Sequence, residues 1–157
     1  MKLHVIFTGK TTGTLFQEAI NDYSKRLNHY IPFSIEELPD LKNTKSLTEE
    51  QQKEREADML FDRLQQGDFL ILLDERGKEF TSREFSLFLE QKMQTVSKRL
   101  VLLIGGPYGF SQRIYDAAQG KISLSKMTFS HQMVRLFLVE QLYRAFTIMR
   151  GEPYHHD

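Results

Sequence analysis

Residues Leu100–Phe110 read LVLLIGGPYGF, and this stretch is the most informative part of the sequence. Five apolar residues run directly into Gly105, Gly106 and Pro107, which is the pattern of a buried strand that ends in a tight bend. A second stretch, Ser123–His156, contains a polar, turn-rich loop and then a helix that is apolar on nearly every side. Together the two stretches predict a ligand pocket beside a buried surface.

The rest of the chain alternates between strand-like and helix-like patterns. Short apolar runs bounded by turn residues predict strands at Leu3–Phe7, Ser34–Leu38, Phe69–Leu73, Leu100–Ile104 and Lys121–Leu124. Apolar residues three or four apart predict helices within residues 15–27, 57–64 and 85–93, and Gly67 fits the end of the second helix. We therefore expect an α/β fold, in which a mainly parallel sheet carries helices on both faces.

Three positions have the spacing of helix starts. Ser46 precedes Glu49, and Thr81 precedes Glu84, at the distance of a capping box. Ser111 is placed to cap a short helix that extends to residue 118.

Length and composition describe one globular domain that spans residues 1–157. Hydrophobic residues make up 40% of the chain and charged residues 27%, and the chain contains no cysteine, which excludes disulfides and zinc-thiolate sites. No stretch approaches the roughly eighteen apolar residues of a membrane span, and the N-terminus shows no signal-peptide cleavage pattern. We expect a cytoplasmic protein without a membrane segment.

The charges are balanced overall but unevenly distributed. The net charge is zero, which argues against a freestanding electrostatic binder of nucleic acid. From residue 98 onward there are eight Lys and Arg against four Asp and Glu, whereas the first 97 residues carry 13 against 17. The C-terminal part could face phosphate, and chance segregation of solvated charges is the alternative.

Two glycine-containing segments fail the common nucleotide-binding patterns. Gly9-Lys10-Thr11 resembles a phosphate-binding loop, but that motif requires a glycine at position 4, which is His4. The segment Gly105–Gly109 lacks the dinucleotide-binding order, and its proline removes a backbone donor. Glycines at this bend still allow close approach of the backbone to a flat ligand, and a plain strand-to-helix turn is the alternative.

Ligands of parallel sheets bind beyond the carboxyl ends of the strands, which here are the residues after Phe7, Leu73, Ile104 and Leu124. The loop Leu124–Phe129 combines backbone amides, hydroxyl groups and apolar side chains, which suits a ligand with an adenine ring and a sugar. An ordinary connecting loop fits the same residues.

The C-terminal helix predicts an interface. Twelve of the seventeen residues from Met133 to Met149 are apolar, so the helix needs a second partner surface besides the sheet. We expect a two-fold homodimer through this helix. Glu140 and Arg144 are spaced for an ion pair.

Titratable residues crowd the C-terminal tail, Pro153–Asp157. Three ligand types on a mobile end are weak grounds for a metal site, so we expect no metal. His131 fits a helix start better than a metal ligand.

Six segments taken together resemble the RlmH-type SPOUT methyltransferases over the whole chain. These are MKLHVI, LLDERGKEFTS, LLIGGPYG, SLSKMT, SHQMVRLFLVEQLYRAFTI and PYHH. The resemblance implies a dimeric SPOUT fold with a C-terminal trefoil knot that holds S-adenosylmethionine. It also implies methylation of N3 of a pseudouridine in 23S rRNA.

Residue by residue, the resemblance implies a cofactor site and a Tyr-His pair in the tail. The cofactor contacts would be Leu73, Gly105, Leu124, Ser125, Lys126, Met127, Thr128 and Phe129. The Tyr-His pair of the family would be Tyr154 and His155. Our own hypothesis is that these two residues orient the uracil ring and accept its N3 proton, and bulk hydroxide is the alternative acceptor. From the residues themselves, we expect Arg135 or Arg144 to hold phosphate or a buried carboxylate. His156 stands where some relatives have an arginine. Ser130 replaces a proline of relatives and keeps a capping group.

The zero net charge indicates weak binding to isolated RNA, so we expect the assembled ribosome to be the substrate. Two other functions remain open on the sequence. One is a SPOUT-type enzyme that acts on transfer RNA or another ribosomal site, and the other is a noncatalytic protein that binds the ribosome. An independent nucleotide-binding module has the least support.

Overall fold

The computed structural model describes all residues 1–157, which form one five-stranded sheet with five helices and a short 3-10 turn. The strands are β1 (Lys2–Thr8), β2 (Phe33–Leu38), β3 (Phe69–Glu79), β4 (Arg99–Ile104) and β5 (Gly120–Ser123). The helices are α1 (Thr14–Leu27), α2 (Glu49–Arg63), α3 (Ser82–Thr95), α4 (Gln112–Ala117) and α5 (His131–Met149). The strand order is β2-β1-β4-β3-β5, and every pair is parallel, which confirms the predicted α/β class.

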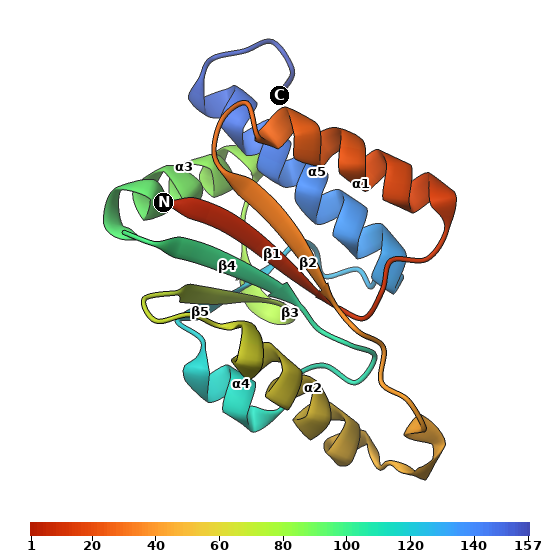
Figure 1. Ribbon diagram of the computed structural model, residues 1–157. Helices are drawn as coiled ribbons and strands as arrows, with labels where there is room; N and C mark the ends of the chain where they lie inside the picture. The colour runs from red at the N-terminus through yellow and green to blue at the C-terminus, as the bar shows by residue number, and fades with distance from the viewer.

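Helices cover both faces of the sheet, as the sequence predicts. Figure 1 shows α1, α3 and α5 on one face and α2 and α4 on the other. The strand order explains which face each helix covers. The connections from β1 to β2 and from β3 to β4 run in one direction across the sheet, and those from β2 to β3 and from β4 to β5 run in the other. Because crossovers between parallel strands are right-handed, the two sets of connecting helices lie on opposite faces. Two buried clusters, one of 19 and one of 10 residues, occupy the two sides of the sheet.

Helix α5 occupies the centre of its layer. It packs against both α1 and α3, and its buried residues include Leu138, Val139, Leu142 and Phe146. These neighbours explain much of the apolar circumference that the sequence shows. Its remaining outward face still exposes Phe137 to 37%.

The predicted helix starts have different outcomes. Thr81 and Glu84 form the expected capping box at α3. The prediction at Ser46 is wrong, because Thr48 and Gln51 form the box of α2. The Ser46 hydroxyl instead donates to the Asn43 carbonyl inside the preceding 3-10 turn, so it is not available to the helix.

Two other positions differ from the sequence-based expectation. Ser111 does precede α4, but its hydroxyl makes no capping bond and is buried without a partner. Gly67 does not end α2, which stops at Arg63, and it instead adopts a φ of 88° in the turn before β3. None of the helices combines the length and apolar character that a bilayer span requires.

Candidate active site

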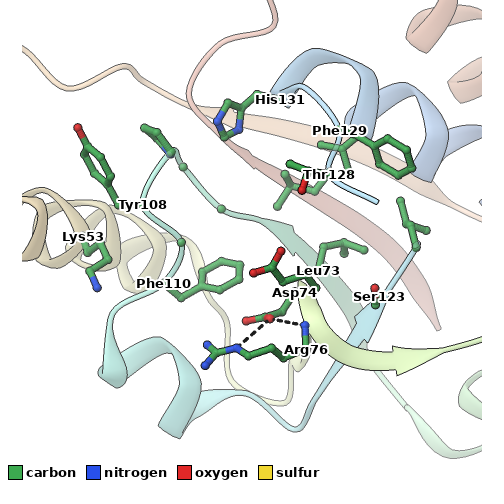
Figure 2. Close-up of a pocket in the computed structure, with 18 of the residues that line it drawn as sticks. Lys53, Leu73, Asp74, Arg76, Tyr108, Phe110, Ser123, Thr128, Phe129 and His131 are labelled. Atoms are coloured by element: carbon green, nitrogen blue, oxygen red, sulfur yellow. Dashed lines mark hydrogen bonds and ion pairs between the residues drawn. The ribbon is translucent and has the colours of Figure 1, made fainter. Parts of the chain in front are cut away.

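A cavity of about 780 Å³ lies at the carboxyl ends of β3, β4 and β5. This volume is within the range of small-molecule sites. Three segments build its wall: the middle of β3, the bend after β4 and the loop after β5 (Figure 2). The cavity therefore lies where the sequence predicts a ligand site.

Strand β3 contributes to the wall because it is interrupted. Leu73 and Lys78 both pair with Ile122, so residues 74–77 bulge out of the ladder. Gly77 allows this bulge, because a Cβ there would lie 2.5 Å from the backbone carbonyl carbon of Ile122. The strand thus extends six residues beyond the predicted end, and its bulge directs polar side chains into the cavity.

The bulge carries a compact polar network. The Tyr115 hydroxyl donates to the Asp74 carboxylate, and the Arg76 guanidinium donates to the Tyr115 hydroxyl at 2.9 Å. The Arg76 backbone amide also donates to Asp74 at 2.8 Å. Burial alone would raise the pKa of Asp74, but these donors outweigh it and hold the pKa below its usual value. Asp74 is therefore an ionised carboxylate in the cavity wall.

The bend after β4 is formed by two glycines that have no room for a side chain. A Cβ at Gly105 would lie 2.8 Å from the Phe110 ring, and a Cβ at Gly106 would lie 2.9 Å from Oε1 of Glu56. The backbone of Gly106 also bridges to Gly109. Close packing on both sides fixes the bend that forms this part of the wall.

The loop after β5 presents free backbone groups. No residue from Leu124 to Phe129 takes part in a backbone-to-backbone hydrogen bond. Two of the loop's backbone groups have side-chain partners: the Met127 amide donates to the Ser125 hydroxyl at 3.0 Å, and the Ser125 carbonyl accepts from the Ser123 hydroxyl at 2.9 Å. Unpaired amides and carbonyls at a cavity edge can read the edge of a heterocyclic ring. Met127, which is 76% exposed, stands at the mouth.

Most of the expected cofactor residues meet in this cavity. Its lining includes Leu73, Gly105, Leu124, Ser125, Met127, Thr128 and Phe129. Lys126 does not line it, and its ammonium points toward Glu79 at 3.8 Å.

Sequence reasoning missed several residues of the wall. These are Glu50, Lys53, Asp74, Glu75, Arg76, Tyr108, Tyr115, His131 and Val134. The charged DERG segment directly after an apolar run was a usable signal for polar side chains at this strand end, although not for the bulge itself. The α2 and α4 residues gave none, because only the packing of these helices brings them to the cavity.

The tail residues lie apart from the cavity wall. The Tyr154 hydroxyl contacts Oε1 of Glu140 at 3.0 Å and the Tyr23 hydroxyl at 3.2 Å. His155 accepts an N–H of Arg144 at Nδ1, 3.1 Å away, and donates from Nε2 to Asp157 at 2.7 Å. Glu140 and Arg144 lie six and ten residues beyond Val134, or about 9 and 15 Å along the helix.

The three expected substrate residues have different environments. Arg144 forms the expected ion pair with Glu140 at 2.7 Å and remains half-buried. His156 is exposed, and its side chain forms no hydrogen bond or ion pair within the chain. Arg135 is only 2% exposed, and its guanidinium donates to the Thr8 carbonyl and the Thr11 hydroxyl, both at 3.0 Å. Arg135 therefore ties α5 to the end of β1 inside the protein.

The structure contains no group of three or more His, Asp or Glu side chains arranged to hold a metal ion.

Comparison with known proteins first defines the class. One similar solved structure is described as a probable methylase family protein from Haemophilus influenzae Rd KW20. The match covers 95% of this chain and 66% of that chain, with a TM-score of 0.53 and 11% sequence identity. At this identity the match shows the fold alone. The family model described as predicted SPOUT methyltransferase matches residues 1–155. The chain belongs to the SPOUT methyltransferase family.

More similar relatives share a single name. The chain is 61% identical to a protein of Parabacteroides distasonis over all 157 residues and the whole of that protein. It is 58% identical, again over the full length of both chains, to proteins of Bacteroides fragilis and Flavobacterium johnsoniae. All three are called ribosomal RNA large subunit methyltransferase H.

Proposed function

We propose that this protein methylates large-subunit ribosomal RNA with S-adenosylmethionine as the methyl donor. The target is N3 of a pseudouridine in 23S rRNA. The observation that carries the proposal is the full-length identity of 61% to a ribosomal RNA large subunit methyltransferase, in a chain whose three wall segments enclose one cavity.

The cavity suits the donor. Free backbone groups of the 124–129 loop fit the edge of an adenine ring, and Phe129 and Leu73 supply apolar faces. The ionised Asp74 suits a cationic ligand. When bound, S-adenosylmethionine supplies an electrophilic methyl group on a positively charged sulfur. The chain itself supplies alignment, which is the main requirement of an in-line displacement.

The path of the chain supports a trefoil knot. Strand β5 lies at one edge of the sheet beyond β3, whereas α5 lies between α1 and α3 on the opposite face from α4 (Figure 1). Residues 124–130 must therefore pass the carboxyl ends of β3 and β4, where they meet the other two wall segments. Threading of this segment through the loop formed by the preceding strands gives the knotted arrangement.

A homodimer through α5 completes the site. Phe137 is exposed on the outward face of α5, and it borders a second cavity of about 250 Å³ together with Phe80, Phe85 and Phe129. Two α5 helices that cross antiparallel near Phe137–Gln141 bring residue 144 of one subunit beside residue 133 of the other. The tail of each subunit then lies at the cavity of its partner. Within a single chain, no tail residue lines the cavity.

In this arrangement Tyr154 and His155 orient the uracil ring, and Arg144 holds both His155 and Glu140 in place. The Arg144 N–H occupies Nδ1 of His155, so Nε2 carries the proton in the neutral ring. The N3 proton of the base passes to solvent or to a side chain of the tail whose hydrogen bonds change when the dimer forms. His156, which is exposed, is the tail side chain placed to contact RNA.

The assembled ribosome in the cytoplasm is the proposed substrate, because a chain of zero net charge gains little affinity from phosphate alone. Purified protein is incubated with S-adenosylmethionine and either ribosomes or protein-free rRNA from a strain that lacks the gene. Mass spectrometry should find one new methyl group on a pseudouridine of 23S rRNA, and only with ribosomes. Methylation of transfer RNA, or no methylation of any RNA, contradicts the proposal.

Mixed dimers test the shared site. One subunit carries His155→Ala and the other carries Thr128→Trp, which fills the cavity from its loop. Each parent homodimer should lose about a hundredfold or more in activity, whereas the mixed dimer should recover about half of wild-type activity, because one of its two sites combines an intact cavity with an intact tail. Inactive mixed dimers would place cavity and tail in the same subunit.

Disruption of the interface gives an independent check. Phe137→Glu should dissociate the dimer in sedimentation velocity and abolish methylation. Leu87→Glu changes an apolar α3 residue that is 58% exposed, and it should leave both properties unchanged.

A further inference from the structure

Glu56 of α2 is a buried carboxylate without a charged partner. Glu56 is 8% exposed, and its Oε1 has no hydrogen-bond partner. No Lys, Arg or His side chain lies within ion-pair distance of its carboxylate. Burial raises the pKa of Glu56, and the Gln52 amide opposes part of that rise. Burial without a charged partner thus favours the neutral carboxyl, and a cationic ligand close to Glu56 would favour the ionised form.

Glu56 lies close to the cavity. Its carboxylate faces Gly106, where a Cβ would lie 2.9 Å from Oε1 and 3.0 Å from Cδ. Gly106 in turn lines the cavity. The carboxylate and the bound ligand would thus be separated by little more than the backbone of one glycine, a distance over which a charge acts strongly in a poorly solvated site.

The charges around the cavity leave Glu56 uncompensated. The wall carries three carboxylates, from Glu50, Asp74 and Glu75, and two cations, from Lys53 and Arg76. Lys53 is engaged by Glu50 at 2.5 Å, and Arg76 is engaged by the Asp74 network. Neither cation is available to Glu56, so the site as a whole has an excess of negative charge.

We infer that Glu56 is a selectivity residue that favours a cationic sulfonium donor over the neutral thioether product. This inference deepens the proposed function and rests on it. During transfer, the bond between methyl carbon and sulfur breaks with its electron pair remaining on sulfur, a bond forms between the methyl carbon and N3, and the N3 proton passes to an acceptor. Sulfur loses its positive charge, so the product is no longer attracted to the Glu56 carboxylate behind Gly106. Product release is thereby favoured over release of the donor.

The test compares ligands that differ in charge at one position. Isothermal titration calorimetry measures binding of S-adenosylmethionine, S-adenosylhomocysteine and sinefungin, which carries an ammonium group near the sulfonium position. Glu56→Gln keeps the shape and removes the charge. It should weaken binding of the two cationic ligands at least tenfold and leave S-adenosylhomocysteine within about twofold, because at an effective dielectric of about 20 a charge-charge interaction is still worth about a factor of ten at about 12 Å and more at shorter separations.

Two comparisons separate selectivity from simple packing. Glu54→Gln removes a charge from the exposed side of the same helix and should leave all three affinities unchanged. Replacing an unpaired buried charge by an isosteric neutral group should also hold or raise the melting temperature of the free protein. A Glu56→Gln protein that melts normally but weakens all three ligands equally, or none of them, overturns the inference. Failure of the wild type to bind any of the ligands contradicts the proposed function instead.

Discussion

The hydroxyl of Tyr154 lies 3.0 Å from Oε1 of Glu140, a residue in the middle of α5. The same oxygen accepts two N–H groups of Arg144, at 3.1 and 2.7 Å. One half-buried carboxylate therefore fixes both the tail and the cation that holds His155. The position of the tail is therefore set by α5, the helix through which we propose dimerisation.

Tyr154→Phe tests whether this hydroxyl anchors the tail or acts as a base. Burial, the hydrogen bond with Tyr23 and the charge of Glu140 raise the pKa of Tyr154 above its usual value, so the phenol stays protonated. We expect the single-turnover methylation rate to fall about tenfold, from the loss of one hydrogen bond to a charged group. The pH dependence of the rate near neutrality should not change. A shifted pH profile would show that the phenolate takes part.

His155→Ala tests the other tail residue. The imidazole is held on both sides, by Arg144 and by Asp157, which is the arrangement of a group that must point in one direction. Its removal should lower the single-turnover rate about a hundredfold, the usual contribution of a positioned acid-base group. His29→Ala removes an exposed histidine of the α1–β2 turn and serves as the matched control. Wild-type rates in both variants would exclude a catalytic role for His155.

Gly77→Ala tests the bulge that supplies Asp74 and Arg76 to the cavity. The added Cβ would lie within 2.5 to 2.7 Å of three backbone atoms of Ile122, which cannot move aside without separating β3 from β5. We expect a loss of about 3 kcal/mol in the free energy of unfolding and no measurable binding of S-adenosylmethionine. Gly120→Ala is the control in the same strand pair, because its Cβ would meet only the flexible end of Ile71 at 3.1 Å. Equal urea midpoints for the two variants would contradict this account.

Arg135→Met separates a structural role from contact with RNA. Loss of the bonds to the Thr8 carbonyl and the Thr11 hydroxyl should lower the free energy of unfolding by about 1–3 kcal/mol. Affinity for ribosomes at a temperature where the variant is folded should match that of the wild type. Arg55→Met, at an exposed position of α2, controls for the loss of one positive charge. Ribosome binding that weakens in Arg135→Met alone would restore this residue as an RNA contact.

The sequence was sufficient for the features that depend on local pattern. Apolar runs located all five strands, and the Thr81 box located the start of α3. The bulge at Gly77 was not predictable, because the need for glycine there comes from Ile122 on another strand. The burial of Arg135 was also hidden, since its acceptors come from the β1 end and the following loop. Nothing in the local pattern around Glu56 indicates burial, because only the packing of α2 places it behind Gly106.

Stability in acid should depend on the half-buried pair Asp68–Arg99, whose closest contact is 2.7 Å. Burial alone would raise the pKa of Asp68, but the Arg99 hydrogen bonds and the Gln65 amide outweigh it, and the pKa lies below the usual 3.8. A carboxyl with a lowered pKa in the folded state stabilises the fold above its unfolded pKa, and this contribution is lost as the pH falls through the folded pKa. Asp68→Asn should therefore be less stable than wild type near neutral pH, and the difference in urea midpoint should shrink below about pH 4. A difference that stays constant across this range would show that the pair contributes through packing rather than through charge.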